Sequence, residues 1–275
     1  MPEENKIRDA ADAIKGALEV VPIYQDALQP MAKEVGIALQ TVAKTLHILL
    51  APVSSLVWSY GTIKDFVVAR VAEKLKDVPT ERLQSPEPYI ACPVIEALRY
   101  TGYQETLRDL YANLLATSID SKTAHTAHPS FVEIIKQMSP DEALIMRSLA
   151  AAPIRPFIDV RKEEKDSHLG TWALKHFSLI PRQASAKCPD LESSYLVNLE
   201  RLGLIQLREN YTLKSGDQDI YQALREAPEI QKLVTEINRI DGHKAQINTG
   251  AIIATDLGHQ FFRACIYEGM HKEQG

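Results

Sequence analysis

The sequence predicts a mainly α-helical protein with a smaller α+β part at its C-terminal end. A seam of apolar residues, spaced mostly by three and four, runs from Leu28 to Leu75, as in packed long helices. Residues 97–150 hold three short helical patterns in one block. Short strand patterns appear only from Phe157 onward. Helices therefore dominate the predicted fold.

The first part of the chain, residues 1–78, is predicted to form a helical arm. Pro30 and Pro52 interrupt its seam, because proline removes a backbone hydrogen bond and clashes with the preceding turn. We therefore expect two or three helices rather than one rod, and self-association through them. A proline-rich linker, residues 79–93, is expected to follow as an extended connection, since each proline restricts its own φ and the residue before it.

A central helical block is predicted over residues 94–138. The apolar positions of its first helix are Leu107, Leu110, Tyr111, Leu114 and Leu115, which form one face at helical spacing. The expected opposite, polar face carries Glu105, Arg108, Asp109 and Asn113. A second helix is expected to begin at Pro129, with a buried stripe of Phe131, Ile134, Ile135 and Met138. Ser139–Pro140–Asp141–Glu142 is a capping box that predicts a third helix start.

The last part, residues 139–275, is predicted to be a winged-helix-like domain with insertions. Strands are expected at Phe157–Val160, Leu204–Leu207 and Ile247–Ala254. Between them we expect a helix ended by a left-handed Gly203 and an inserted helix at Ile220–Ile240. After the last strand, Thr255 is expected to cap a final helix.

The helix at Leu191–Leu202 occupies the place of a DNA-recognition helix. It offers Glu192 and Glu200 against Arg201, whereas a helix that reads a groove normally presents Arg, Lys, Asn or Gln. The net charge of −5 also argues against general nucleic-acid binding. A protein-interaction role is therefore favoured over DNA binding, which stays an alternative.

Thr45 to Ile63 contains no Asp, Glu, Lys or Arg. Its length reaches the lower range for crossing a bilayer. Polar residues on the face away from the seam, with Pro52 and Gly61, favour a buried hairpin instead. A hairpin that enters the membrane on activation stays an alternative.

Composition indicates an ordinary globular protein of a reducing cytoplasm. Apolar residues make up 45% and charged residues 24%, and three well-separated cysteines do not suggest a disulfide framework. The charged N-terminus lacks the apolar core of a signal peptide.

No catalytic set, cofactor motif or metal site is predicted. Asp120, His125 and His128 have metal-ligating side chains, but no closed ligand set surrounds them, and His128 is placed to cap the next helix. Cys188 and Cys265 are expected to be structural, because no third group would orient His259 as a base.

Candidate interaction residues lie in and around the central block. Tyr and Arg are common anchors of protein interfaces. The candidates are Arg99, Tyr100, Tyr103, Arg108, Tyr111 and His128. The tyrosines would serve equally well to hold the helices together.

Three phrases of the central block carry a resemblance to a known family. They are Glu96–Tyr100 (EALRY), Leu110–Ala116 (LYANLLA) and His128–Ile135 (HPSFVEII), with Leu50–Pro52 and Val57–Trp58 fitting as well. Over roughly residues 28–270, the chain resembles the Abi-alpha (abortive infection alpha) family of bacterial proteins. The resemblance implies a role in phage defence and supplies no catalytic residue. We therefore expect a non-enzymatic phage-defence protein that acts through protein–protein interaction, with a membrane-acting effector and a DNA-binding regulator as alternatives.

Overall fold

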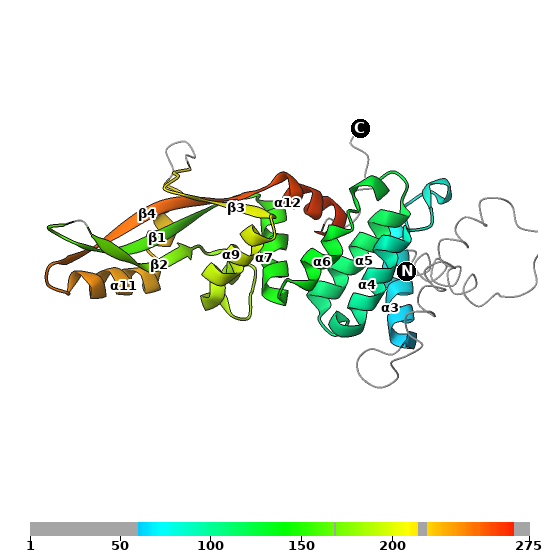
Figure 1. Ribbon diagram of the computed structural model, residues 1–275, viewed down its shortest axis with the longest axis horizontal. Coiled ribbons are helices and arrows are strands. Elements are labelled where there is room, and N and C mark those ends of the chain that lie inside the picture. Colours follow the sequence, from blue (N-terminus) through cyan, green and yellow to red (C-terminus); the bar gives the residue numbers. More distant parts are fainter. Residues whose placement is uncertain (1–59, 168, 214–218, 267–275) are drawn as a thin grey trace, which may run out of the picture. The chain divides into compact units, whose positions relative to one another are not determined.

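The computed structural model describes residues 60–167, 169–213 and 219–266, which fall into two compact units. Unit 1 holds residues 60–137 and 260–266, and unit 2 holds the described residues between 138 and 259 (Figure 1). The predicted arm up to residue 59 lies outside the described residues, and so does most of Thr45–Ile63.

Unit 1 is built from helices that pack around one central helix, α5 (Figure 1). Its helices are α3 (Tyr60–Leu75), α4 (Pro88–Thr101), α5 (Glu105–Ile119) and α6 (Ser130–Lys136), with short turns at Thr80–Arg82, Ala124–Thr126 and Phe262–Ile266. The apolar face predicted for α5, from Leu107 to Leu115, is buried as expected. The stripe of α6 is also buried, and this helix begins one residue after Pro129.

The prediction of an exposed polar face on α5 is wrong at two positions. Asp109 and Asn113 are buried. Arg70 of α3 donates to Asp109 Oδ1 at 3.3 Å, and Asn113 Nδ2 donates to the carbonyl of Cys265 at 2.7 Å. Because α5 has neighbours on both sides, Asp109 and Asn113 are used as internal hydrogen-bonding groups rather than as part of a solvated face.

The expected extended stretch across residues 79–93 is helical from Pro88 onward. Pro88 occupies the first helical position of α4, where a proline lacks a hydrogen bond that would be unmade anyway. Pro93 lies inside the same helix. Ile90, Val94 and Ile95 form a fully buried stripe, and this apolar burial outweighs the cost of the internal proline.

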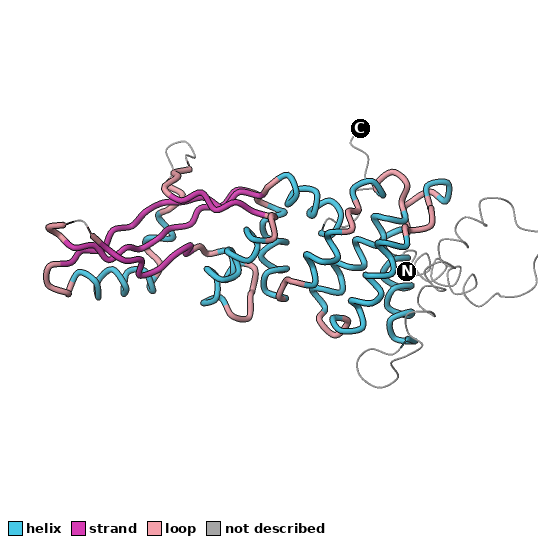
Figure 2. The backbone as a smooth tube through the Cα atoms, viewed as in Figure 1, coloured by secondary structure: helices cyan, strands magenta, loops and turns pink. Residues whose placement is uncertain are grey.

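Unit 2 contains a four-stranded antiparallel sheet in the order β2-β1-β4-β3 (Figure 2). Its strands are β1 (Ile154–Glu164), β2 (Gly170–Phe177), β3 (Ile205–Glu209) and β4 (His243–Ala254). The predicted fold class, mainly α with a small winged-helix-like end, is therefore wrong. The chain is mixed α+β, because two long central strands and an added hairpin strand, β2, build a sheet larger than the sequence patterns indicated.

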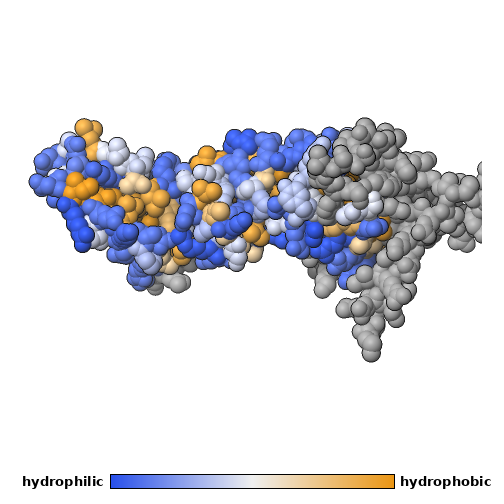
Figure 3. All heavy atoms as spheres, turned by 90° about the horizontal axis from the view of Figure 1, so that it is seen from below, coloured by the Kyte–Doolittle hydropathy of each residue, from blue (hydrophilic) through white to orange (hydrophobic). Residues whose placement is uncertain are grey.

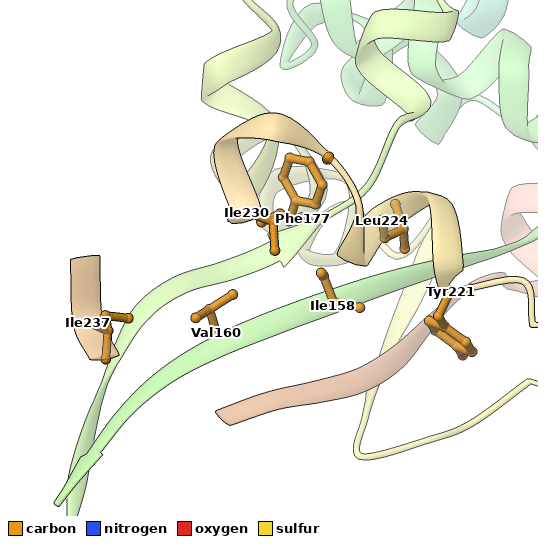
Figure 4. Close-up of a cluster of buried hydrophobic side chains, with 8 residues drawn as sticks. Ile158, Val160, Phe177, Tyr221, Leu224, Ile230 and Ile237 are labelled. Atoms are coloured by element: carbon orange, nitrogen blue, oxygen red, sulfur yellow. The ribbon is translucent and has the colours of Figure 1, made fainter. Parts of the chain in front are cut away.

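The helices of unit 2 are α7 (Pro140–Ala151), α8 (Ile180–Gln183), α9 (Glu192–Arg201), α10 (Gln222–Arg225), α11 (Pro228–Asn238) and the start of α12 (Asp256–Phe261), with a 3-10 turn at Pro189–Leu191. The helices α10 and α11 pack on one face of this sheet, and α9 contacts β2 and β3. Figure 4 shows Ile158, Val160 and Phe177 of the sheet packed against Leu224 and Ile230 of α10 and α11. The inserted helix expected at Ile220–Ile240 is thus two helices that complete the core.

Two helix-end signals of unit 2 are confirmed. The Ser139 hydroxyl accepts from the Glu142 N–H at 3.2 Å, and the Glu142 carboxylate accepts from the Ser139 N–H, which completes the capping box. Thr255 Oγ1 accepts from the Gly258 N–H at 3.0 Å and so caps α12.

Gly203 ends α9 in the left-handed conformation, with φ of +75°. The N–H of Leu204 donates to the Leu199 carbonyl and the N–H of Gly203 to the Glu200 carbonyl, which is the hydrogen-bond pattern of a Schellman cap. A Cβ at residue 203 would meet only Leu257 Cδ2, at an ordinary 3.5 Å. The requirement for glycine is therefore conformational rather than steric.

Gly203→Ala is expected to lower the free energy of unfolding by about 1 to 2 kcal/mol, because alanine resists positive φ. Gly203→Asn is the matched control and should cost less, since asparagine tolerates this conformation. Chemical denaturation measures both variants. An equal loss for the two would show that side-chain crowding, rather than backbone conformation, sets the cost.

Candidate functional site

The exposed face of α4 carries aromatic side chains of unit 1. Tyr89, Tyr100 and Tyr103 expose 58%, 56% and 65% of their surface. Tyr89, Glu96 and Tyr100 are separated by seven and four residues, so they lie on one side of the helix, opposite its buried apolar stripe. Tyr103 follows just after the helix ends. We call these four residues the tyrosine face.

Arg99 accompanies this face. Its guanidinium carbon lies 5.7 Å from the centre of the Tyr100 ring, within the range of a cation–π contact. The structure therefore brings together three of the six predicted interaction residues: Arg99, Tyr100 and Tyr103.

The other three predicted residues have structural contacts. Arg108 donates to the Gly102 carbonyl at 3.3 Å and lies 5.2 Å over the Phe66 ring. Tyr111 is fully buried, and burial together with the nearby Glu133 raises the pKa of its hydroxyl. The exposed His128 lies just before the N-cap residue Pro129, and its Nδ1 accepts from the Ser130 N–H at 3.1 Å at the start of α6.

The residues with metal-ligating side chains near α6 are not assembled into a ligand set. Asp120 is fully buried and pairs with Arg82, and it also accepts from the Lys122 N–H at 3.0 Å. His125 is exposed. Across the described parts of the chain, no group of three or more His, Cys, Asp or Glu is placed to hold a metal ion.

Cys265 lies fully buried in unit 1. Burial raises the pKa of its thiol well above the usual range, because the apolar surroundings disfavour the thiolate. A thiol in this state is a poor nucleophile, and the side chain acts as a small apolar group.

A buried histidine of unit 2 was missed by the sequence patterns. Between the pairs Ile158–Phe177 and Val160–Leu174, β1 has one residue, Asp159, and β2 has two. This mismatch is a β-bulge, and it holds His176 at a φ of +58°. Asp159 Oδ1 accepts from the backbone N–H of His176 at 2.7 Å, which fixes the bulge.

The bulge directs the imidazole of His176 into the protein, where only 5% of the residue is exposed. The ring meets the edge of Phe157 at 5.2 Å between centres. Ser193 Oγ of α9 lies 3.3 Å from Nδ1, and Glu209 Oε1 of β3 lies 3.6 Å from Nε2. The imidazole thus links β2, β3 and α9.

The Ser193 hydroxyl, the His176 imidazole and the Glu209 carboxylate follow one another in the order found in catalytic acid–base triads. The Glu209 carboxylate also interacts with Lys175. Lys175 Nζ donates to the same Glu209 oxygen at 2.5 Å, and this contact lowers the pKa of that carboxyl. The neighbouring Asp159 is also buried, and this burial raises the pKa of its carboxyl. With the ring enclosed, the arrangement is suited to holding strands together rather than to attacking a substrate.

None of the helices in the described parts of the chain combines the length and the apolar character needed to cross a membrane.

Comparison with known proteins gives one family. A family model described as Abortive infection alpha matches residues 60–265. A solved structure of an uncharacterized protein from the hydrocarbon-degrading marine bacterium Alcanivorax borkumensis SK2 is similar over 47% of this chain and 87% of that chain, with 19% identity and a TM-score of 0.34. No curated protein matches the chain. Because the family match spans well over half of the 275 residues, the chain belongs to the Abortive infection alpha family.

Proposed function

We propose that the chain is a non-enzymatic abortive-infection protein that acts by binding a protein partner through the tyrosine face. Membership of the family supports the role in abortive infection. The single observation that supports the binding surface is the exposure of Tyr89, Tyr100 and Tyr103, of which Tyr89 and Tyr100 lie on one side of α4.

The spacing of these rings suits a protein partner. A helix rises about 1.5 Å per residue, so Tyr89 and Tyr100 are separated by about 16 Å along α4. This distance falls within the core of a standard protein–protein interface. Tyrosine loses little conformational entropy when it is immobilised, because it has few rotatable bonds, and its hydroxyl offers a hydrogen bond at the rim.

The contact between Arg99 and Tyr100 strengthens this interpretation. A guanidinium over the ring restrains the tyrosine before a partner arrives, which lowers the entropic cost of binding. Glu96, exposed between the two tyrosines of α4, adds a charge that selects among partners.

The test is phage plating on a bacterial host that expresses the chain, compared with a frameshifted control, at low and high infection ratios. The double variant Tyr100→Ser with Tyr103→Ser should lose protection, because removing two interface anchors weakens binding by about tenfold or more. Tyr211→Ser is the matched control, since Tyr211 of unit 2 is 48% exposed and should be dispensable.

Circular dichroism on the purified variants establishes that the double variant is folded. Protection by the folded double variant equal to that of the parent would remove the tyrosine face from the proposal. An unchanged plating efficiency for the parent across a broad phage panel would show that this chain alone does not provide defence. Depolarisation of infected cells, unaffected by the tyrosine substitutions, would favour the membrane-acting alternative.

A further inference from the structure

Unit 1 is completed by a segment that follows unit 2 in the chain. Residues 138–259 come between α6 and residues 260–266, yet residues 260–266 belong to unit 1. They comprise the end of α12 and the π-helical turn Phe262–Ile266, which contacts α5. We call residues 260–266 the strap, and we call its position against α5 the closed position.

Side chains of α5 hold the strap by its carbonyl groups. Asn113 Nδ2 donates to the carbonyl of Cys265 at 2.7 Å, and Thr117 Oγ1 donates to the carbonyl of Ala264 at 3.0 Å. Asn113 and Thr117 lie one turn apart on α5, so the two donors share a face. A π-helical turn is rare and occurs frequently at functional sites. Here the turn presents two successive carbonyls to this face of α5.

Apolar packing makes the closed position the dominant one. Phe261 and Phe262 are fully buried, and Phe261 meets Phe131 of α6 edge to face at 5.4 Å between ring centres. Ala264 and Cys265 are buried as well. Figure 3 shows apolar side chains exposed at the end of unit 2 that carries α11 and the β1–β2 hairpin, whereas these side chains of the strap are enclosed in unit 1. An open strap would therefore uncover apolar surface that the closed position hides.

One buried group opposes the closed position. The hydroxyl of Tyr111 on α5 is fully buried, and no donor or acceptor in the described parts of the chain pairs with it. Such a hydroxyl destabilises the state that buries it, because it has lost its hydrogen bonds to water. Burial raises the pKa of this hydroxyl, and the nearby Glu133 and Cys265 act in the same direction. Since Cys265 belongs to the strap, water reaches the Tyr111 hydroxyl when the strap leaves α5.

We propose that the strap opens from α5 as a unit while α3 to α6 stay folded, and that it thereby gates access to the side of α5 that carries Tyr111, Asn113 and Thr117. In the open state, residues 138–259 are joined to the folded part of unit 1 only through the chain after Gln137. The strap is separate from the tyrosine face on α4, and its test does not depend on phage plating.

The test measures how fast a maleimide reacts with the Cys265 thiol in the full chain. Cys92→Ala and Cys188→Ala leave Cys265 as the sole cysteine, because the chain has three. Trp58→Phe leaves Trp172 as the sole tryptophan of two, and its emission reports whether unit 2 is folded. Since Cys265 is fully buried, it reacts only after the strap or the whole of unit 1 opens. The expected labelling rate rises only weakly with urea below the unfolding transition, because opening the strap exposes much less surface than unfolding the unit.

A threonine variant tests the hydrogen bonds that hold the strap. Thr117→Val removes the donor to the Ala264 carbonyl with little change of shape, and it should speed labelling by about fivefold. Thr101→Val is the matched control, because Thr101 Oγ1 donates to the Ala97 carbonyl within α4 at the same 3.0 Å. The control should change the labelling rate by less than about twofold. Circular dichroism establishes that both variants are folded.

Tyr111→Phe tests the group that opposes closure. The variant removes the unpartnered hydroxyl and keeps the ring, so the closed position becomes more favourable and labelling should slow by about fivefold. A tyrosine that merely supports the core would give the opposite sign, because the loss of a useful contact speeds opening.

Three results would overturn the proposal. The first is a labelling rate that rises with urea as steeply as global unfolding, followed by circular dichroism, which would make the strap part of one cooperative unit. The second is labelling of Thr117→Val no faster than that of Thr101→Val. The third is faster labelling of Tyr111→Phe than of the parent.

Discussion

Asp141→Ala is expected to lower the free energy of unfolding of unit 2 by about 2 to 4 kcal/mol. The Asp141 carboxylate at the start of α7 is buried and accepts three hydrogen bonds at 2.9 Å. The donors are the backbone N–H groups of Lys187 and Cys188 and the hydroxyl of Tyr195. Truncation removes all three bonds and leaves the Tyr195 hydroxyl without its acceptor in a buried place.

The pKa of Asp141 gives the pH dependence of this contribution. Burial opposes ionisation, but the three hydrogen bonds prevail and lower the pKa of the carboxyl below its ordinary value. A carboxyl whose pKa is lowered by folding stabilises the folded state above its unfolded pKa. The contribution is therefore present at neutral pH and is lost as the pH falls below about 4.

Two milder variants should rank below the alanine variant. Tyr195→Phe removes one hydrogen bond and keeps the ring, so it should cost about 1 kcal/mol. Asp141→Asn keeps one acceptor oxygen and should be intermediate. Urea denaturation followed by Trp172 emission in the Trp58→Phe background reports on unit 2. A cost for Asp141→Ala no greater than that for Tyr195→Phe would contradict the three-bond account.

Local signals of helix ends could be predicted from the sequence because each depends on a few neighbouring residues. The capping box at Ser139 and the left-handed Gly203 are examples, and the structure confirms both. The second hydrogen bond that the capping residue Glu142 makes could not be predicted from the sequence. Glu142 also accepts from Asn198 Nδ2 at 2.7 Å, a contact between α7 and α9 that depends on the tertiary fold.

The strand β2 was missed because its pattern is weak. Gly170 to Ala173 are exposed, so apolar and polar residues do not alternate there. The bulge at Lys175 and His176 then shifts the alternation by one residue. The charged residues Arg161–Glu164 lie in β1, where Glu163 is buried beside Lys244.

For the candidate interaction residues, too, the local sequence could not predict which side chains would be exposed. The sequence identified Tyr100 and Tyr103 but could not separate them from Tyr111, because a tyrosine can equally well anchor an interface or hold helices together. The structure separates them by exposure: Tyr111 is enclosed by neighbours on both sides of α5, whereas α4 leaves one face open. The His176 cluster joins residues of β2, α9 and β3, and no local pattern connects these segments.

Glu192→Gln is expected to stabilise unit 2 by about 2 to 4 kcal/mol above pH 8 and to change little below pH 4. Glu192 begins α9 and is buried, and its carboxylate accepts from the N–H and the hydroxyl of Ser178. Burial raises the pKa of this carboxyl to about 8 from an ordinary value of 4.5, although the hydrogen bonds from Ser178 act in the opposite direction.

The direction in which the free energy of unfolding changes with pH follows from the number of protons that the folded and unfolded chains bind. Between pH 4.5 and about 8 the folded state keeps a proton on Glu192 that the unfolded chain has released. The stabilising contribution is complete below the unfolded pKa and is lost as the pH rises through the folded pKa, at up to about 1.4 kcal/mol per pH unit. Glutamine is neutral at every pH in this range and keeps an oxygen that accepts from Ser178. The free energy of unfolding of the Glu192→Gln variant therefore does not fall in this way as the pH rises.

The measurement is the difference in unfolding free energy between Glu192→Gln and the parent from pH 4 to pH 9, which cancels groups common to both chains. Asp190→Asn is the matched control, because Asp190 lies two residues away and is exposed, and its curve should follow the parent. Parallel curves for Glu192→Gln and the parent would show that Glu192 is ionised in the folded state. A difference that grows through this range would instead identify one buried carboxyl as the group that destabilises unit 2 in alkali.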